Sequence, residues 1–528
     1  MLRLRQIRLN ISNQDINSLK KKICNILKIS LSDINSVKIV KKSLDARNKN
    51  NLLYVYEVDV NVDNEDKILL RNKSKDIFKT PIEEYNFKIS GTQKMTHKPI
   101  IVGSGPCGLF CAYILTENGY KPIIIERGEK VEDRINSIEQ FWKTGNLNIN
   151  SNIQFGEGGA GTFSDGKLNT LTKDTANRNK KVFEIFIENG APEEIMYINK
   201  PHIGTDILRK VIINMRNKII SMGGEFKYNT TLTDIIVEND ELKAIEINNN
   251  EIINCETLIL AIGHSARDTF QMLKEKNIQM EAKSFAVGLR IEHPQDMINK
   301  AQYGENNKFL PPAEYKLTYQ TKKGRGVYSF CMCPGGYVVN ASSEENHLAI
   351  NGMSNYKRDS KNANSAIVVT VTPQDFGNDV LSGIIFQKDL ERKAYELGNG
   401  KIPIQTLKDF YNNEKTKELG SIEPIVKGNY QFSNINEIIP EFISESIKEA
   451  LPNFNKKIKG FNRDDTLLFA VETRTSSPVR IKRNDLGVSS IKGIYPAGEG
   501  AGYAGGITTS AIDGVKVAEN IAKIYGNQ

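Results

Sequence analysis

"IVGSGPCG" (residues 101–108) is the stretch that decides the fold, because glycines at 103, 105 and 108 directly follow an apolar run. Glycines at this spacing let the backbone turn sharply and approach a pyrophosphate, and they open a helix whose N-terminus favours negative charge. An apolar helix-like run (109–119) and a second strand-like run, "KPIIIER" (121–127), come next. The segment therefore predicts a strand, helix, strand unit.

An acidic residue, Glu126, stands at the end of the second predicted strand, 18 residues after Gly108. A carboxylate in this place can accept hydrogen bonds from a ribose. The alternative, a glycine turn that only packs a helix on a sheet, would need the strand, the helix and the acid to coincide by chance. We therefore predict a dinucleotide site whose first contacts are Gly103, Ser104, Gly105, Pro106, Cys107, Gly108, Glu126 and Arg127.

The C-terminal segment "GIYPAGEGAGYAGGITTSAIDG" (493–514) indicates which dinucleotide binds. It reads as a buried strand, a glycine-dense turn and a helix that starts near Ile507. A nicotinamide enzyme would not need this second element, whereas the dipole of such a helix would stabilise the anion of a reduced flavin. FAD is therefore favoured, with contacts from Gly498, Glu499, Gly505, Gly506, Ile507 and Thr508.

Two internal segments agree with an FAD site. "QFGEGGAGTFSDGKL" (154–168) is a glycine-rich loop that could follow the phosphates and the ring of the flavin; its alternative is an ordinary surface loop. "LILAIGHS" (258–265) reads as a strand and a turn that return the chain to the cofactor. The residues assigned in these two segments are Gly159, Ala160, Gly161, Thr162, Lys167, Ala261 and Gly263.

Together, "VGSGPCGLFCA" (102–112), "FGEGGAGTFSDGKL" (155–168), "VETRTSSPVRI" (471–481) and "YPAGEGAGYAGGITTSAIDG" (495–514) resemble the bacterial family of FAD-dependent (NAD/FAD-utilising) dehydrogenases. The resemblance covers nearly the whole chain. It implies a Rossmann-like domain of the glutathione-reductase superfamily type and non-covalent FAD. It also implies that Glu499 lies on the ribityl chain and that Leu232 and Thr233 lie beside the adenine. The family leaves the substrate open.

The rest of the α/β chain predicts two further domains. Residues 1–95 follow the order βαββαβ, with a last strand at "YNFKI" (85–89), and predict a ferredoxin-like α+β domain. They hold 19 Lys and Arg against 11 Asp and Glu, a net charge of +8 that equals the excess of the whole chain. The FAD-binding domain is expected at 96–285 and 456–528, interrupted by a mixed α/β substrate domain at 286–455.

Catalytic candidates lie in and after the insert. If "YSFCMCPGGYVV" (328–339) is a strand, Cys331 and Cys333 share a face, where a thiol pair could pass electrons or attack a substrate. Two such residues are poorly placed for an unstrained disulfide, and they could equally be small core residues. Arg474 could hold an anionic substrate and Glu472 could move a proton, unless the two form a structural salt bridge. The five histidines form no ligand cluster, so no metal is predicted.

These features predict an FAD-dependent oxidoreductase that transfers a hydride between flavin N5 and an unidentified small molecule. No second strand, GxGxxG, helix unit follows residue 190, so NADH or NADPH would have to bind at the flavin face or in the insert. Two alternatives stay open: a flavoprotein that acts on or binds RNA through its basic N-terminal domain, and a flavin-binding sensor or scaffold. The cysteine spacing and the lack of a leader-like or membrane-length apolar run predict a cytoplasmic location.

Overall fold

The N-terminal domain is an antiparallel four-stranded sheet with two helices. The structure is a computed structural model that describes residues 1–170, 172, 174–304 and 309–527. In this domain the strands lie in the order β2-β3-β1-β4, so that β3 separates the two strands that α1 connects. Its elements are β1 (Leu2–Asn10), α1 (Ile16–Leu27), β2 (Ile34–Asp45), β3 (Leu53–Val62), α2 (Glu65–Arg71) and β4 (Ile77–Lys79).

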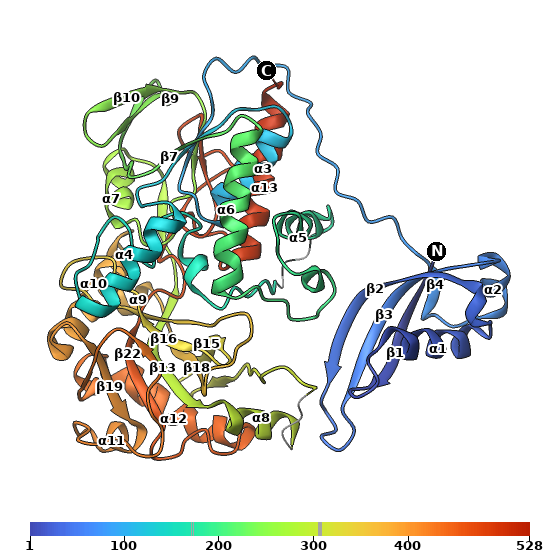
Figure 1. Cartoon of the computed structure of the whole chain (residues 1–528). Coiled ribbons are helices and arrows are strands. Elements are labelled where there is room, and N and C mark those ends of the chain that lie inside the picture. Colours follow the sequence, from blue (N-terminus) through green and yellow to red (C-terminus); the bar gives the residue numbers. More distant parts are fainter. Residues whose placement is uncertain (171, 173, 305–308, 528) are drawn as a thin grey trace.

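The last strand of this domain differs from the sequence prediction. The edge strand is β4, which pairs with β1, and residues 85–89 form no strand. Tyr85 and Phe87 instead pack against the core of the next domain, and the backbone N–H groups of Ser90 and Gly91 donate to the carbonyl of Ala522. Residues 80–95 are thus a connection that crosses from the N-terminal domain to the C-terminal helix (Figure 1).

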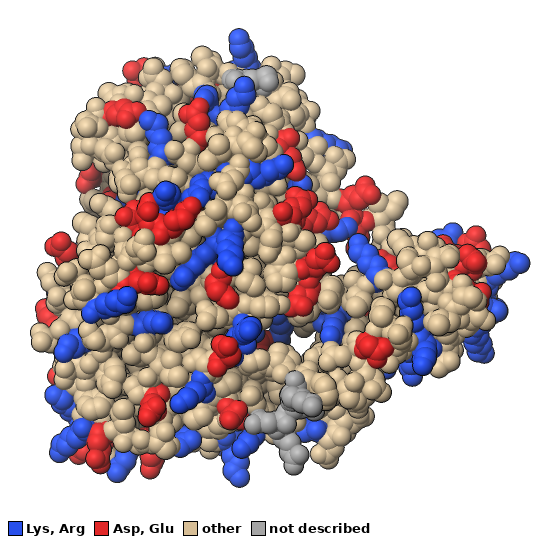
Figure 2. Space-filling view, in the orientation of Figure 1, with Lys and Arg blue, Asp and Glu red and all other residues tan. Residues whose placement is uncertain are grey.

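The N-terminal domain touches the main body through the outer edge of β2. The N–H of Lys42 donates to the carbonyl of Tyr197 (2.7 Å), and the N–H of Asn199 donates to the carbonyl of Lys42 (3.0 Å). At Lys42 the edge of β2 is therefore paired with the main body rather than open to another strand. Figure 2 shows acidic side chains among the basic ones on the face of the domain in view, so the charge there is mixed.

A five-stranded parallel sheet forms the centre of the second domain. Its order is β24-β11-β5-β6-β7, and helices α3, α6 and α13 lie against it (Figure 1). Strands β5, β11 and β24 are fully buried, whereas the edge strand β7 is partly exposed. A smaller antiparallel sheet of β8, β9 and β10 is attached. The strands are β5 (Ile100–Val102), β6 (Ile123–Ile125), β7 (Glu225–Lys227), β8 (Leu232–Glu238), β9 (Glu241–Ile247), β10 (Glu251–Asn254), β11 (Leu258–Leu260) and β24 (Ile494–Pro496). The helices are α3 (Pro106–Glu117), α4 (Val131–Thr144), α5 (Arg178–Glu188), α6 (Thr205–Ser221), α7 (Arg267–Glu275) and α13 (Ile507–Ile524).

Helices α3 and α13 approach each other closely, although they are far apart in the sequence. A Cβ atom added to Gly514 would lie 2.1 Å from the carbonyl oxygen of Cys107, and one added to Gly498 would lie 2.8 Å from the Cβ of Cys107. The carboxylate of Asp513 accepts the N–H of Gly498 (2.7 Å) and pairs with Arg483 (2.7 Å). These contacts place the two glycine-rich turns next to each other.

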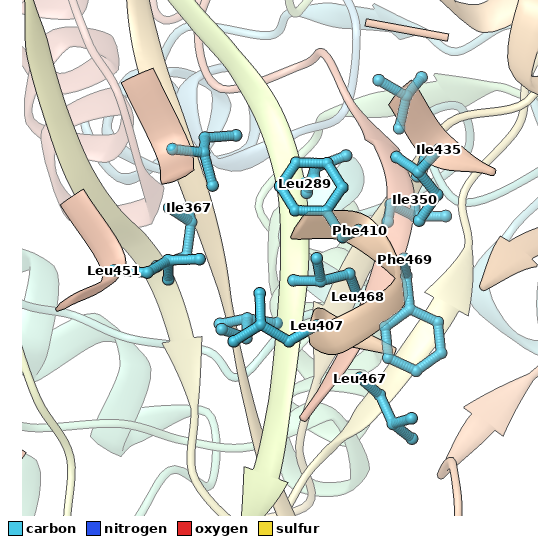
Figure 3. Close-up of a cluster of buried hydrophobic side chains, with 14 of the residues drawn as sticks. Leu289, Ile350, Ile367, Leu407, Phe410, Ile435, Leu451, Leu467, Leu468 and Phe469 are labelled. Carbon is cyan, nitrogen blue, oxygen red and sulfur yellow. The ribbon is translucent and has the colours of Figure 1, made fainter. Parts of the chain in front are cut away.

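A seven-stranded sheet builds the inserted domain, in the order β14-β15-β18-β13-β22-β19-β21. Helix α12 packs against it, and the buried apolar side chains of this domain, which include Leu289, Ile367, Leu451 and Phe469, form one cluster (Figure 3). The strands are β13 (Phe285–Pro294), β14 (Thr318–Gln320), β15 (Gly326–Cys333), β18 (Asn362–Val371), β19 (Ile402–Thr406), β21 (Tyr430–Phe432) and β22 (Leu467–Glu472). The helices are α8 (Gln295–Tyr303), α9 (Pro373–Phe376), α10 (Ser382–Gly398), α11 (Leu407–Asn412) and α12 (Glu441–Lys457).

The C-terminal limit of this sheet differs from the predicted domain boundary at 455. That boundary cuts α12, and β22 pairs with β13 and β19 beyond it. Strand β22 is buried along its whole length. Its apolar side chains are kept from water because the strand lies inside the inserted sheet. Small sheets of β16 (Tyr337–Asn340), β17 (Ile350–Met353) and β20 (Val426–Lys427), and of β12 (Met280–Ala282) and β23 (Val479–Ile481), complete the described fold.

Gly514→Ala tests the helix contact. We expect the change to lower stability by about 1–3 kcal/mol, because the added methyl group collides with the backbone of α3 even though alanine favours helices. Thermal unfolding followed by circular dichroism measures the effect, with Lys523→Ala on the exposed face of the same helix as the control. An unchanged or higher Tm for Gly514→Ala would contradict the close approach.

Candidate functional site

One cavity of about 550 Å³ lies between the carboxyl ends of the parallel strands and the inserted sheet. Crevices at this edge of a parallel sheet are the usual place for ligands. The cavity brings together most of the side chains and turns assigned from the sequence. Of these, the lining includes Gly103, Gly105, Pro106, Cys107, Glu126, Arg127, Gly159, Ala160, Gly161, Lys167, Leu232, Ala261, Gly263, Cys331, Glu472, Arg474, Glu499, Gly505, Gly506 and Ile507.

The remaining assigned residues do not line the cavity. The hydroxyl of Thr508 donates to the carbonyl of Leu168 (2.8 Å), and that of Thr233 donates to the carbonyl of Glu246 (3.2 Å). Thr162 and Cys333 are buried, and the glycines at 108 and 498 allow close packing. The assigned residues outside the lining are Ser104, Gly108, Thr162, Thr233, Cys333, Gly498 and Thr508.

Glu126 is fixed by the chain around it. One carboxylate oxygen accepts the N–H (2.9 Å) and the hydroxyl (2.8 Å) of Ser104, and the other accepts the N–H groups of Gly128 (3.0 Å) and Gly156 (2.9 Å). A carboxylate has about four acceptor positions, so these four donors fill them. A ribose hydroxyl that bonds to Glu126 would displace the Ser104 hydroxyl, which can rotate.

The glycines on the cavity wall fit an extended dinucleotide. A Cβ atom added to Gly505 or Gly263 would meet no atom within 4 Å, and one added to Gly105 would meet only Gly159, at 3.8 Å. All three residues line the cavity, so the missing side chains leave space that FAD can use. Helix α3 begins at Pro106 and α13 at Ile507, and both N-termini provide N–H groups without helical partners. The residues present therefore fit FAD.

The loop at 154–168 is held from below by a buried arginine. The Arg134 guanidinium is fully buried and donates to the carbonyl groups of residues 152, 153, 156, 157 and 159. Most of the loop backbone is buried, which excludes the alternative of an ordinary surface loop. Arg134 lies in the amphipathic helix α4, and its sequence gives no signal of this role.

Both predicted catalytic residues of the segment 471–481 line the cavity, and both are paired from behind. Glu472 accepts from Arg290 (2.9 and 3.0 Å), which is fully buried. Arg474 donates to Glu391 (2.9 and 3.0 Å), and Arg267 binds the same carboxylate. Although burial raises the pKa of Glu391, the two guanidinium groups hold that pKa well below its usual range. The site thus presents fixed, paired charges to the cavity.

The two cysteines occupy different positions in the cavity wall. Cys331 lines the cavity and is partly exposed, whereas Cys333 is fully buried behind it. Lys167 lies beside them, because its ammonium group donates to the carbonyl of Met332, which stands between the two cysteines. The same ammonium group pairs with Asp165 (3.1 Å).

Several lining residues were not assigned from the sequence. Gln154, Ser265 and Asn351 place amide or hydroxyl groups in the cavity, and His264 lies at the turn after β11. Burial, together with the charges of Arg474 and Arg267, lowers the pKa of His264 to about 3, so the ring is neutral at pH 7. The turn after β11 is the only feature of the sequence that could have indicated these groups.

Among the residues that the structure describes, no group of three or more His, Cys, Asp or Glu side chains is arranged to hold a metal ion. Within the same ranges, every helix is too short or too polar to cross a membrane.

Three family models match parts of the chain. Residues 284–475 match the model described as "FAD-dependent protein, C-terminal domain-like", and residues 101–152 match an NAD(P)-binding Rossmann-like domain. Residues 1–61 match a domain of unknown function.

Solved structures that match the chain include the flavin-dependent brominase Bmp2, at 12% identity and a TM-score of 0.39 over 82% of this chain and 80% of that one. L-proline dehydrogenase from P. horikoshii matches at 14% identity and a TM-score of 0.34, over 81% of this chain and 94% of that one.

A relative that matches the whole chain shows which family the protein belongs to. An uncharacterized protein of Clostridium beijerinckii is 48% identical over 531 residues, which cover 99% of each chain. The chain therefore belongs to the family of this protein, and its matched domains mark it as an FAD-dependent flavoprotein of the oxidoreductase type.

Proposed function

We propose that this flavoprotein transfers a hydride between flavin N5 and a small substrate held against the inserted domain. One observation carries the proposal: a single cavity is lined both by the glycine turns of the parallel-sheet domain and by β15 and β22 of the inserted sheet. When bound, FAD would supply the two-electron chemistry. The chain would supply position, charge and exclusion of water.

The ADP half would lie on the turn between β5 and α3. The N–H groups at the start of α3 would face the pyrophosphate, and Glu126 would face the adenosine ribose. The ring would lie toward Gly161, Cys331 and the N-terminus of α13, where the helix dipole favours a negative flavin. Lys167 adds a positive charge on the same side of the cavity.

The substrate would lie on the side of the inserted domain. Four of the five N–H groups of Arg474 already bind Glu391, Ser265 and Ser343, so this residue acts mainly by orienting its neighbours. Lys316 also lines the cavity and has no ion pair among the described residues. Its exposed ammonium group is the better candidate to attract an anionic group of the substrate.

Anaerobic reduction tests the proposed function. We expect the purified, FAD-loaded protein to lose its flavin absorbance when NADH or NADPH is added, and to regain it with one member of a panel of quinones, enones and disulfides. FAD-loaded Lys316→Ala should need more substrate for the same rate, while its flavin content stays normal.

Two results would separate the parts of this proposal. A yellow protein that neither donor reduces and no acceptor reoxidises would overturn hydride transfer while FAD binding stands. A colourless protein that refuses added FAD would overturn both.

Gly505→Ala tests the fit of FAD. Nothing lies within 4 Å of the added methyl group, so we expect the unfolding temperature of the apoprotein to stay unchanged. The methyl group would enter the space of the cofactor, so the Kd for FAD should rise about tenfold or more. Fluorescence titration of the apoprotein with FAD measures this change.

Gly145→Ala is the matched control, because Gly145 is exposed, lies outside the cavity and has a φ of +82°. It should lower stability through backbone strain and leave the Kd for FAD unchanged. Equal affinities for Gly505→Ala and the wild type would contradict the assigned position.

Glu499 makes the stability of the apoprotein depend on pH. Burial raises the pKa of this carboxyl to about 7, Lys283 opposes the shift, and Cys331 adds to it. Between the ordinary pKa of Glu and 7, the folded state keeps a proton that the unfolded state has lost, so stability falls as pH rises through this window.

We expect Glu499→Gln, which stays neutral, to be more stable than the wild type at pH 8 by roughly 3 kcal/mol and nearly equal to it at pH 5. Thermal unfolding of the apoproteins at the two pH values measures this difference. Glu437→Gln, at an exposed position, should show no such dependence. A constant difference between the wild type and Glu499→Gln across this range would show that Glu499 does not titrate there.

A further inference from the structure

Strand β15 is irregular at Cys331. Its pairing with β18 shifts by one residue between Phe330 and Cys333, and the φ of Cys331 is +43°. Most non-glycine residues with positive φ in the described chain are asparagines, for which this conformation costs little. A cysteine in this conformation is held there by its surroundings, and such outliers are concentrated at functional sites.

The irregularity brings the two thiols together. A regular strand would separate residues 331 and 333 too far for an unstrained bond. Here the Cys333 thiol turns back toward residue 331 and donates to the carbonyl oxygen of Cys331 (3.4 Å). Cys331 opens to the cavity and Cys333 lies behind it, so one sulfur can meet a ligand while the other stays covered.

Cations surround the pair. Arg290 donates to the carbonyl of Cys331 (3.2 Å), and Lys167 donates to the carbonyl of Met332 between the two cysteines. The hydrogen bond from Cys333, followed by the charges of Arg290 and Lys167, lowers the pKa of Cys331 to about 6 against the effect of burial. The pKa of Cys333 is raised well above its usual value.

Acidic groups oppose this shift only in part. Glu472 faces Cys331 and raises its pKa, but the carboxylate is already paired with Arg290. Cys107 provides a contrast within the same cavity: it lies on α3, and burial raises the pKa of its thiol well above the usual value. Position in the cavity alone therefore does not lower the pKa of a thiol; at Cys331 the hydrogen bond from Cys333 and then the charges of Arg290 and Lys167 do so.

We infer that Cys331 and Cys333 form a redox-active dithiol that exchanges two electrons with the flavin. The inference rests on the proposed function, since it needs FAD in the cavity. In the forward direction the S–H bond of Cys333 breaks and an S–S bond forms. The Cys331 thiolate, the Cys333 thiol and FAD then give a disulfide and FADH⁻, because two electrons and the Cys333 proton pass to the flavin. In reverse, FADH⁻ reduces the disulfide.

A tryptic peptide makes the pair measurable. Cleavage after Arg325 and Lys357 releases residues 326–357, which contain Cys331 and Cys333 and no other cysteine. The FAD-loaded protein is equilibrated without oxygen in mixtures of reduced and oxidised dithiothreitol, quenched with acid, denatured, alkylated with iodoacetamide and digested. We expect the peptide to change from doubly alkylated to unalkylated and lighter by two hydrogen atoms as the mixture becomes oxidising, in step with the flavin spectrum.

Variants separate the roles of the two sulfurs. The wild type in which the dithiol is reduced and the FAD is oxidised should show a broad thiolate-to-flavin absorbance at long wavelength, since Cys331 is ionised at pH 7. Cys333→Ser should keep this absorbance and lose the disulfide, and Cys331→Ser should lose both. Cys24→Ser, at a partly exposed position in the N-terminal domain, is the control and should behave like the wild type.

The outcomes distinguish the two proposals. A yellow protein whose peptide stays doubly alkylated in every mixture would overturn the dithiol and leave the proposed function standing. A disulfide that forms without any change in the flavin spectrum, or that persists in Cys331→Ser, would also overturn it. A colourless protein would overturn the proposed function, and with it the exchange between sulfur and flavin.

Discussion

The close approach of α3 and α13 at Cys107 is the constraint on which the cavity depends. Only a residue without a side chain fits at Gly514, because an added Cβ would lie 2.1 Å from the carbonyl oxygen of Cys107. The contact joins residues that are more than 400 positions apart, and it sets the turn after β5 beside the turn after β24. Both helices then begin at the same cavity, so their N-terminal N–H groups act together on one ligand.

Buried ion pairs fix the second wall of the cavity. Glu391 on α10 binds Arg267 on α7 and Arg474 after β22, so one carboxylate connects the parallel-sheet domain with the inserted sheet. A buried charge that loses its partner costs several kcal/mol, and this cost makes the three-way arrangement the favoured one. Because Glu391 is fully buried, the geometry of Arg474 in the cavity is determined from behind, before any substrate enters.

The sequence predicted those parts of the site that a short segment specifies. The strand, glycine turn, helix order around Gly103 and around Gly505 is local, and both segments reach the cavity. The hydrogen bonds of Arg134 and Glu391 could not be predicted, because their partners are fixed only when distant segments pack. The strand expected at 85–89 failed for a related reason: its aromatic residues are apolar enough for a strand, but they pack against another domain. The positive φ of Cys331 depends on its register with β18, which no pattern within β15 specifies.

The charges in the cavity explain why a thiolate, a neutral carboxyl and a reduced flavin could share one site. Glu499 and Cys331 raise each other's cost of ionisation, so the site favours one negative charge over two. In the proposed exchange the negative charge leaves Cys331 as the disulfide forms and appears on the flavin. The net charge of the site is then the same before and after, and Lys167 and the N-terminus of α13 stay close enough to stabilise it in both positions. Ionisation of Glu499 would add a second negative charge to this site; burial and Cys331 oppose it and Lys283 favours it, so the pKa of this carboxyl is raised, to about 7.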